Sequence, residues 1–414
     1  MTTVTERWID PARIANAIEE LAEFGARGET GVARLVYSPE WSAAQDQVAA
    51  WMAEAGLRVE RDAVGNVWGY LDGAEESGIL ATGSHIDSQN PGGRFDGALG
   101  VVAGIAALRV LSERFGQPQR TLAVVSLVEE EASRFAAANF WGSRAITGGI
   151  RTDDPETTIG FGGETIANAM REVGLDPALI PEARRADIDS FVELHIEQGP
   201  ILEHANLPVA IVTGITGIRH YEIELRGTQN HAGAFPMDLR RDPIAGFSEI
   251  ASGVIDTAHR WGRPAVSTVG RIHVKPNATA IIPESVTFTL DARHPDPDLC
   301  QKLYDTHENF MREVAKRRNL EIKWRIMIDH PACPSDAALV STLRTAADTQ
   351  GVPTMLMASG AGHDSQQMAK IAKVAMIFVR SKEGRSHTPD EFSSIEDIVA
   401  GIEVLAAGLH RLAY

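Results

Sequence analysis

The chain has 414 residues, a net charge of −17 and 44% hydrophobic residues, values that suit a globular protein large enough for two domains. The negative charge argues against nucleic acid or an anionic membrane surface as the main partner. The sequence contains no run of 18 apolar residues that could span a membrane. With only Cys300 and Cys333, and no basic-then-apolar signal pattern in residues 1–8, we expect a cytoplasmic protein without disulfides.

The first 75 residues predict two helices followed by a strand. Asp10 and Pro11 supply an N-cap and a proline at the first helical position, so we expect a helix over residues 11–23. A second helix is expected over residues 43–55 and a strand over residues 64–71. The chain thus begins with helices that lead into a sheet.

Short apolar runs follow, and each is bounded by residues typical of turns. They lie at residues 79–82, 122–128, 191–194 and 375–379. Because their apolar residues mostly do not alternate with polar ones, we expect strands buried on both faces of a sheet. A helix of small residues is expected over residues 97–111, and strand–helix–strand spacing of this kind is typical of an α/β fold.

The middle of the chain, from about residue 213 to 327, has a different pattern. Its strands alternate apolar and polar residues, as at 221–225 and 286–291, and helices are expected at 245–261 and 297–318. The alternation predicts an antiparallel sheet with helices on one side. We therefore expect one domain in two parts, at residues 1–213 and 329–414, and a smaller α+β domain inserted in it at residues 214–328.

Histidines and carboxylates come shortly after the predicted strands. They are His85, Glu129 to Glu131, His195 and His387, with Asp96 at the expected start of the helix. Taken singly, each histidine is more often a core or surface residue, Asp96 could cap the helix, and the glutamates could form a solvated strand end. Together, at the carboxyl ends of strands, these donors suit Zn²⁺ or Mn²⁺, with Co²⁺ and Ni²⁺ possible.

These residues lie in five of seven motifs that occur in a fixed order. They are Gly-Ser-His-Ile-Asp at 83–87, Gly-Gly-Arg-Phe-Asp-Gly at 92–97, Glu-Glu-Glu-x-Ser-Arg-Phe at 129–135, Glu-Leu-His-Ile-Glu-Gln-Gly at 193–199, His-Ala-Gly at 231–233, Ser-Gly-Ala-Gly-His-Asp at 359–364 and Ser-His-Thr-Pro at 386–389. This set resembles the amidase/hydantoinase/carbamoylase branch of the M20 metallopeptidase-like family, from about residue 10 to the end. The resemblance implies a catalytic domain of the metal-dependent exopeptidase type with a mostly parallel sheet. It also implies an inserted α+β lid domain through which a homodimer forms.

The resemblance implies two divalent metal ions and a set of catalytic groups. Asp96 would bridge the ions, His85 and His195 would complete one ligand set, and Glu131 and His387 the other. Glu130 would be the general base and Asp87 would orient His85. His231 would stabilise the oxyanion of the tetrahedral intermediate.

The resemblance also implies residues that bind a small anionic substrate. Arg293 would hold the substrate carboxylate, with weaker candidates at Gln198, Arg219, Asn277, Ser359 and Gly360. The sequence departs from the family pattern in two places. Ala280 replaces an asparagine that contacts substrate, and Ala234-Phe235 replaces two threonines. These changes predict an active hydrolase with altered specificity.

The activity that the resemblance implies is hydrolysis of a linear ureido or amide acid, most simply an N-carbamoyl-L-amino acid. An allantoate amidohydrolase is the main alternative, because the segment at residues 139–144 is closer to that group. An exopeptidase or an N-acyl amino acid amidase would use the same metals. A non-catalytic binding protein is disfavoured by the retention of Glu130 beside all five ligands.

Overall fold

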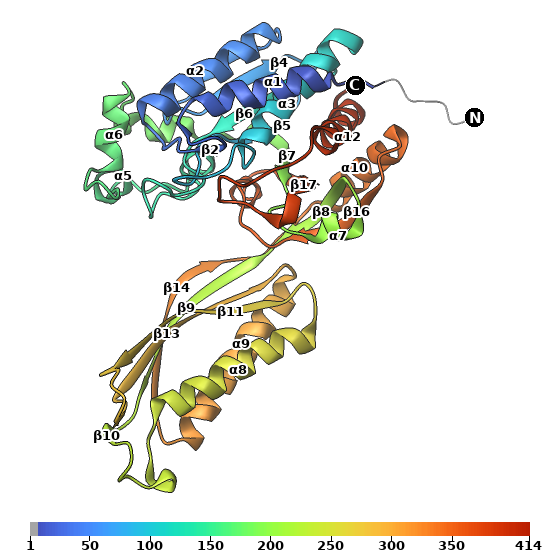
Figure 1. Cartoon of the computed structure of the whole chain (residues 1–414). Coiled ribbons are helices and arrows are strands. Elements are labelled where there is room, and N and C mark those ends of the chain that lie inside the picture. Colours follow the sequence, from blue (N-terminus) through green and yellow to red (C-terminus); the bar gives the residue numbers. More distant parts are fainter. Residues whose placement is uncertain (1–6) are drawn as a thin grey trace. The chain divides into compact units, whose positions relative to one another are not determined.

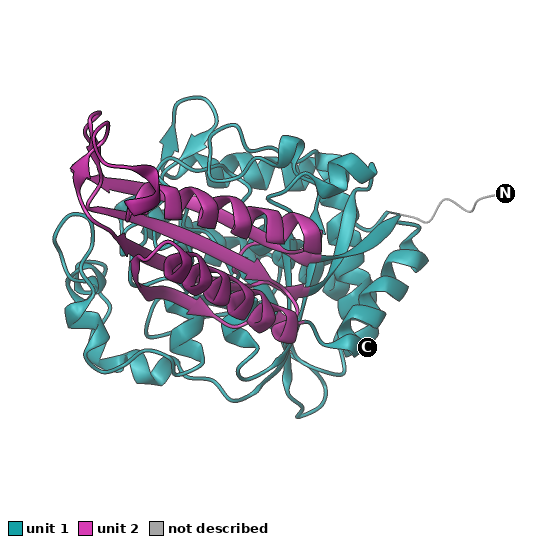
Figure 2. Ribbon diagram, turned by 90° about the horizontal axis from the view of Figure 1, so that it is seen from below, with its two compact units in different colours: residues 1–213, 335–357, 363–414 teal, residues 214–334, 358–362 magenta. Residues whose placement is uncertain are grey.

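The computed structural model describes residues 7–414 and divides the chain into two compact units (Figures 1 and 2). Most of the first eight residues, where no signal sequence is expected, lie outside the described residues. Unit 1 comprises the chain up to Thr213 with Ser335–Met357 and His363–Tyr414, and unit 2 comprises Gly214–Pro334 with Ala358–Gly362. Unit 2 extends past residue 328 because the strand β14 (Glu321–His330) belongs to its sheet.

Two capped helices begin unit 1. The helix α1 (Pro11–Glu23) has the predicted bounds, and the Asp10 carboxylate accepts a hydrogen bond from the Ala12 N–H. The helix α2 (Pro39–Glu54) begins four residues before the predicted start, because Ser38 and Pro39 form a second N-cap and proline pair. The strands β3 (Arg58–Arg61) and β4 (Val67–Leu71) follow.

The sheet of unit 1 has parallel strands at its centre. Four neighbouring strands run in the order β17 (Lys373–Val379), β7 (Ile188–Ile196), β5 (Ile79–His85) and β6 (Leu122–Leu127), and each adjacent pair is parallel. Antiparallel strands flank them, β8 (Val209–Ile215) beside β17 and then β4 and β3 beside β6. The predicted α/β fold with a mostly parallel central sheet is confirmed.

Helices pack against this sheet and explain why its strands lack alternation. The helix α3 (Ala98–Phe115) contacts β5, β6 and β7, and α12 (Ile395–Ala413) contacts β7 and β17. Gly104 allows α3 to lie close to β6, because a methyl group at this position would overlap the Val124 side chain. All residues of β6 are buried, as expected for a strand covered on both faces.

Unit 2 is an α+β unit with a four-stranded antiparallel sheet. The strand order is β11 (Val266–Lys275), β13 (Ser285–His294), β9 (Gly217–Arg226) and β14. The helices α8 (Pro243–Trp261) and α9 (Pro297–Arg317) lie side by side along one face (Figure 1). Across residues 7–414, no helix is long and apolar enough to span a membrane.

Candidate active site

The carboxyl ends of the four parallel strands place the candidate ligands at one edge of the sheet. His85 is the last residue of β5 and His195 lies one residue before the end of β7. Glu129–Glu131 follow the end of β6, and the loop after β17 carries His387. Because β17, β7, β5 and β6 are neighbours that run parallel, side chains beyond their ends converge.

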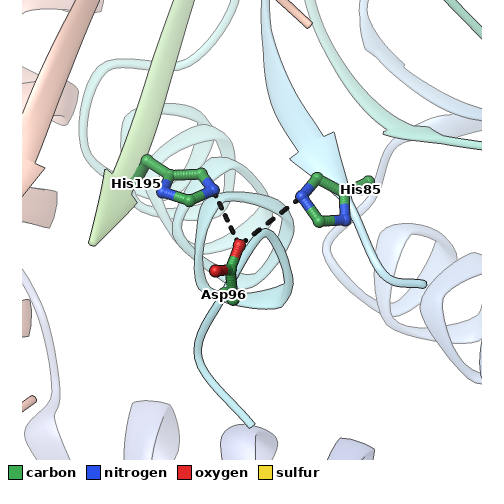
Figure 3. Close-up of side chains that lie close together, drawn as sticks. All are labelled: His85, Asp96 and His195. Carbon is green, nitrogen blue, oxygen red and sulfur yellow. Dashed lines mark ion pairs between the residues drawn. The ribbon is translucent and has the colours of Figure 1, made fainter. Parts of the chain in front are cut away.

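A first cluster consists of His85, Asp96 and His195 (Figure 3). Asp96 Oδ1 lies 3.2 Å from His195 Nε2 and 3.7 Å from His85 Nε2. The other ring nitrogen of each histidine lies near a backbone carbonyl: His85 Nδ1 is 3.0 Å from the Asp87 oxygen and His195 Nδ1 is 2.9 Å from the Ile196 oxygen. These contacts orient both Nε2 atoms toward Asp96, the arrangement of metal-binding histidines.

A second cluster uses the other oxygen of Asp96. His387 Nε2 lies 3.6 Å from Asp96 Oδ2 and 3.3 Å from Glu131 Oε2. Asp96 is therefore shared, with one oxygen facing each cluster. It does not cap α3, because the N-cap residue is Gly97, whose φ of 63° favours glycine. The second cluster is the more open of the two, since the His387 side chain is 49% exposed.

The charges of both clusters fit divalent cations. Burial opposes the ionised form of Asp96, but His195, His85 and His387 outweigh it and hold the pKa of Asp96 well below its usual range. Burial also opposes the charge on His195, yet Asp96 raises the pKa of His195 to about 9. Burial and the Asp96 charge raise the pKa of Glu131. This carboxylate has an oxygen, Oε1, that is buried without a hydrogen-bond partner among the described residues. Carboxylate and imidazole donors with an unpaired oxygen suit Zn²⁺, Mn²⁺ and similar ions.

A third group of potential ligands, formed by Glu193, His195 and His363, is explained by packing. Glu193 Oε1 accepts a hydrogen bond from the Ser84 hydroxyl, and Oε2 accepts from the backbone N–H and hydroxyl of Ser365. The His195 and His363 rings contact edge to face, with centroids 4.6 Å apart. With the Glu193 oxygens engaged and His195 directed to Asp96, this group is not a separate metal site.

The three consecutive glutamates have different surroundings. Glu129 has a φ of 51°, and its carboxylate accepts hydrogen bonds from the N–H groups of Arg134 and Phe135, so it shapes the loop. Glu130 points to the first cluster, with Oε2 at 3.7 Å from His85 Nε2. Asp87 accepts hydrogen bonds from the N–H groups of Glu130 and Glu131, and thereby holds this loop beside His85.

Glu391 and Ser386 are residues of the site that the sequence reasoning missed. Glu391 Oε1 accepts hydrogen bonds from the N–H groups of Phe95 and Asp96, and the Ser386 hydroxyl lies 2.5 Å from Asp96 Oδ2. Burial and the Asp96 charge raise the pKa of Glu391 to about 7. The only sequence signal was an acidic residue four positions after His387. Gln198, predicted to bind substrate, donates a hydrogen bond from Nε2 to Asp96 Oδ2 at 2.7 Å.

Within unit 2, His231 caps a turn. Its Nδ1 accepts hydrogen bonds from the N–H groups of Gly233 and Ala234, both at 3.0 Å. Because Nδ1 is an acceptor, the neutral ring carries its proton on the exposed Nε2. Ala280 is adjacent, since its carbonyl accepts from the Ala232 N–H, and Asn277 is exposed with a φ of 57°.

The other substrate candidates in unit 2 divide into two groups. Arg293 lies beside the loop of Ser359 and Gly360, because its Nη1 donates a hydrogen bond to the Gly360 carbonyl at 2.7 Å. Its Nε and Nη2 donate to Asp291 at 2.9 and 2.8 Å. Arg219 instead lies on the sheet face that α8 and α9 cover, where it pairs with Asp329 and stacks on Tyr304. The structure therefore does not bring Arg219 together with Arg293.

Comparisons with known proteins agree with this architecture. Residues 81–411 match the family model of peptidase family M20/M25/M40. An allantoate amidohydrolase of Escherichia coli is 38% identical over 96% of this chain and 98% of that protein. An N-carbamoyl-L-amino acid amidohydrolase of Geobacillus stearothermophilus is 38% identical over 98% of this chain and 99% of that protein.

Among solved structures, an amidase of the hydantoinase/carbamoylase family from Burkholderia multivorans has a TM-score of 0.90. It is 33% identical to this chain, and the match covers 98% of each chain. These similarities extend over both units, and so do the seven ordered motifs, five of which contain the candidate metal ligands. The chain belongs to peptidase family M20/M25/M40, and its structural relatives are amidases of the hydantoinase/carbamoylase family.

Proposed function

We propose that this protein is a hydrolase that uses two divalent metal ions to cleave a C–N bond of a linear ureido acid. The simplest reaction converts an N-carbamoyl-L-amino acid and water to the amino acid, CO₂ and NH₃. The observation that carries this proposal is the position of Asp96, which directs one oxygen to each of two ligand clusters. A shared carboxylate of this kind is typical of two-metal hydrolytic sites.

The proposed ligand sets follow the two clusters. His85, Asp96 and His195 would hold one ion, and Asp96, Glu131 and His387 the other. Zn²⁺ or Mn²⁺ fits these donors best, with Co²⁺ and Ni²⁺ as further candidates. When bound, such ions lower the pKa of a water molecule and polarise the substrate carbonyl.

Glu130 is the proposed general base. Its Oε2 would accept the proton of the attacking water molecule and deliver it to the leaving nitrogen. Burial and the neighbouring carboxylates, Glu131 foremost, raise the pKa of Glu130. A base with a raised pKa can both accept and release a proton near neutral pH, which supports this role. Asp87 would hold Glu130 and His85 in place, since its carboxylate accepts from the Glu130 N–H and its backbone oxygen lies beside His85 Nδ1.

His231 is the proposed stabiliser of the tetrahedral intermediate. Its Nε2–H is the donor that remains after Nδ1 has accepted two backbone hydrogen bonds. A fixed donor of this kind can stabilise the negative charge that develops on the substrate carbonyl oxygen. Because His231 belongs to unit 2, we propose that unit 2 acts as a lid during turnover.

Arg293 is the proposed anchor for the substrate carboxylate. Asp291 and the Gly360 carbonyl orient its guanidinium group, and Ser359 shapes the adjoining loop. Ala280 lacks the side-chain amide of the asparagine that the family resemblance implies at this position, which favours a substrate with fewer polar groups at that point. We propose that Ala280→Asn shifts preference toward ordinary N-carbamoyl amino acids.

Hydrolysis of allantoate is a second candidate, favoured by the 38% identity to the Escherichia coli enzyme and by the segment at residues 139–144. The test follows hydrolysis by the metal-reconstituted protein, measured as ammonia released from N-carbamoyl-L-amino acids and allantoate and as amino acid released from matched N-acyl amino acids. Turnover of a ureido acid supports the proposal, and the preferred substrate separates the two candidates. Turnover of N-acyl amino acids alone would contradict it.

We also propose that the protein is a cytoplasmic homodimer. Both edge strands of the unit 2 sheet expose apolar residues, among them Ile272 in β11 and Met327 in β14, and such edges pair readily with another chain. The two free cysteines suit a reducing compartment. Sedimentation equilibrium should give twice the chain mass, and a monomer at micromolar concentration would contradict the dimer.

A further inference from the structure

We propose that Glu391 is a positioning residue for the metal centre, on which binding of the second ion depends. The second ion is the one assigned to Asp96, Glu131 and His387. This inference rests on the proposed two-metal function. It adds a residue that is not itself a ligand but connects the two loops that carry ligands.

The geometry connects these loops at two points. Glu391 Oε1 accepts hydrogen bonds from the N–H groups of Phe95 and Asp96, both at 2.9 Å. Glu391 Oε2 lies 3.1 Å from the hydroxyl of Ser386, the residue before His387. One carboxylate therefore contacts the backbone of the shared ligand and the neighbour of a terminal ligand. These two contacts set how far apart Asp96 and His387 lie.

Ser386 strengthens this connection. Its hydroxyl lies 2.5 Å from Asp96 Oδ2 and 3.1 Å from Glu391 Oε2. A hydroxyl group has a single proton, so it donates to one of these carboxylates at a time. If Asp96 Oδ2 bound a cation, the Ser386 hydroxyl would donate its hydrogen bond to Glu391 instead. This bond would hold the His387 loop against the Asp96 loop.

The surroundings show that the chain accommodates Glu391 specifically. Glu391 is 4% exposed, and a methyl group on Gly93 would overlap its side chain. Glycine at this position therefore leaves the space that the carboxylate fills. Burying a carboxylate close to Asp96 is unfavourable for folding, since both carry negative charge. A positioning role in metal binding explains why an acid stands there.

The test compares metal binding by Glu391→Ala and Glu391→Gln with that of the wild type. Metal-free protein is titrated with Zn²⁺ against a chromophoric chelator, which gives the affinity of each ion without reference to activity. Glu403→Ala is the matched control. Glu403 Oε1 also accepts two backbone N–H bonds, from Trp8 at 2.6 Å and Ile9 at 2.9 Å, but it lies in α12 and contacts no candidate ligand.

We expect Glu391→Ala to lower the affinity for the second ion about 10- to 100-fold, the range for residues that orient metal ligands. The affinity for the first ion should fall much less. Glu391→Gln should remain within about threefold of the wild type, because its amide oxygen can still accept the two N–H bonds and its NH₂ group can donate to the Ser386 hydroxyl oxygen. Glu403→Ala should bind both ions normally. Unchanged affinity in Glu391→Ala, equal weakening of both ions, or failure of Glu391→Gln to restore binding would each overturn the positioning role.

Gly93→Ala provides a second variant if Glu391→Ala does not fold. The added methyl group displaces the Glu391 side chain, so the affinity for the second ion should fall in this variant too. Normal binding of both ions by Gly93→Ala would overturn the inference. The wild-type titration keeps the two proposals separate. Fewer than two ions in the wild type would contradict the proposed function, whereas two ions with unaltered variants would contradict only the role of Glu391.

Discussion

At the scale of single residues, three adjacent glutamates differ in what surrounds them. The Glu129 carboxylate is occupied by the N–H groups of Arg134 and Phe135, whereas Glu130 faces His85 and Glu131 faces His387. Burial and the Asp87 charge raise the pKa of Glu129, and burial and the Glu131 charge raise the pKa of Glu130. One replacement, glutamate to glutamine, should therefore have different effects at neighbouring positions.

We expect Glu130→Gln to retain both metal ions and to lose at least about 10²–10⁴-fold in kcat, the usual contribution of general acid–base catalysis. Glu129→Gln is the matched control. An amide oxygen can accept the same N–H bonds, so its kcat should stay within a few-fold of the wild type. Steady-state ammonia release and elemental analysis provide both readouts. If Glu130→Gln retained full activity on every substrate, Glu130 would not be the base.

Arg293 allows a prediction about substrate binding. Arg293→Ala should raise KM for carboxylate substrates by a factor equivalent to about 2–5 kcal/mol, because the substrate anion would lose its partner. The metal content should stay unchanged, since Arg293 contacts none of the candidate ligands. The control is a set of carboxamide analogues. Wild-type preference between carboxylate and carboxamide in the variant would show that Arg293 does not bind the anion.

At the scale of helices and strands, the sequence predicted elements where local signals were complete. Asp10 with Pro11 predicts the start of α1 correctly, whereas the predicted start of α2 at residue 43 leaves out the N-cap and proline pair of Ser38 and Pro39. The unalternated runs predicted the parallel strands, and hence the edge where His85 and His195 meet. Loops were harder. Glu391 acts through backbone N–H groups almost 300 positions away, a contact that no local pattern encodes.

The contact between α9 and β11 gives unit 2 a pH-dependent stability. His307 in α9 is buried with Nε2 at 2.8 Å from the Ser267 hydroxyl, and burial lowers its pKa to about 4. The unfolded chain takes up this proton near pH 6.5. The contribution of neutral, buried His307 to the free energy of unfolding is therefore complete above pH 6.5. It is lost as the pH falls toward 4, and the loss is on the order of 3 kcal/mol at most.

Urea unfolding at pH 7.5 and pH 5 tests this prediction. The free energy of unfolding should fall more steeply toward acid for the wild type than for His307→Gln, which lacks the titrating group. His259→Gln, on the exposed side of α8, should behave like the wild type. Equal falls for the wild type and His307→Gln would contradict the assigned pKa.

At the scale of the whole molecule, the chain enters unit 2 twice, whereas the strand alternation in the sequence predicted a single insertion. The expected insertion at residues 214–328 followed from a change in strand alternation. The segment Ala358–Gly362 also belongs to unit 2, and it binds Arg293 through the Gly360 carbonyl. Five residues carry no periodicity that could assign them to either unit. Spatial partners such as Gly360 were therefore suggested only by the ordered motifs, and the hydrogen bond itself required the structure.

The most direct test of the two-metal site is the number of ions bound per chain. After reconstitution and dialysis, elemental analysis should find two ions in the wild type and one in His387→Ala. It should find none in Asp96→Ala, because Asp96 belongs to both ligand sets. Circular dichroism of each variant verifies that it is folded. Two ions retained by a folded Asp96→Ala would contradict the shared-carboxylate centre.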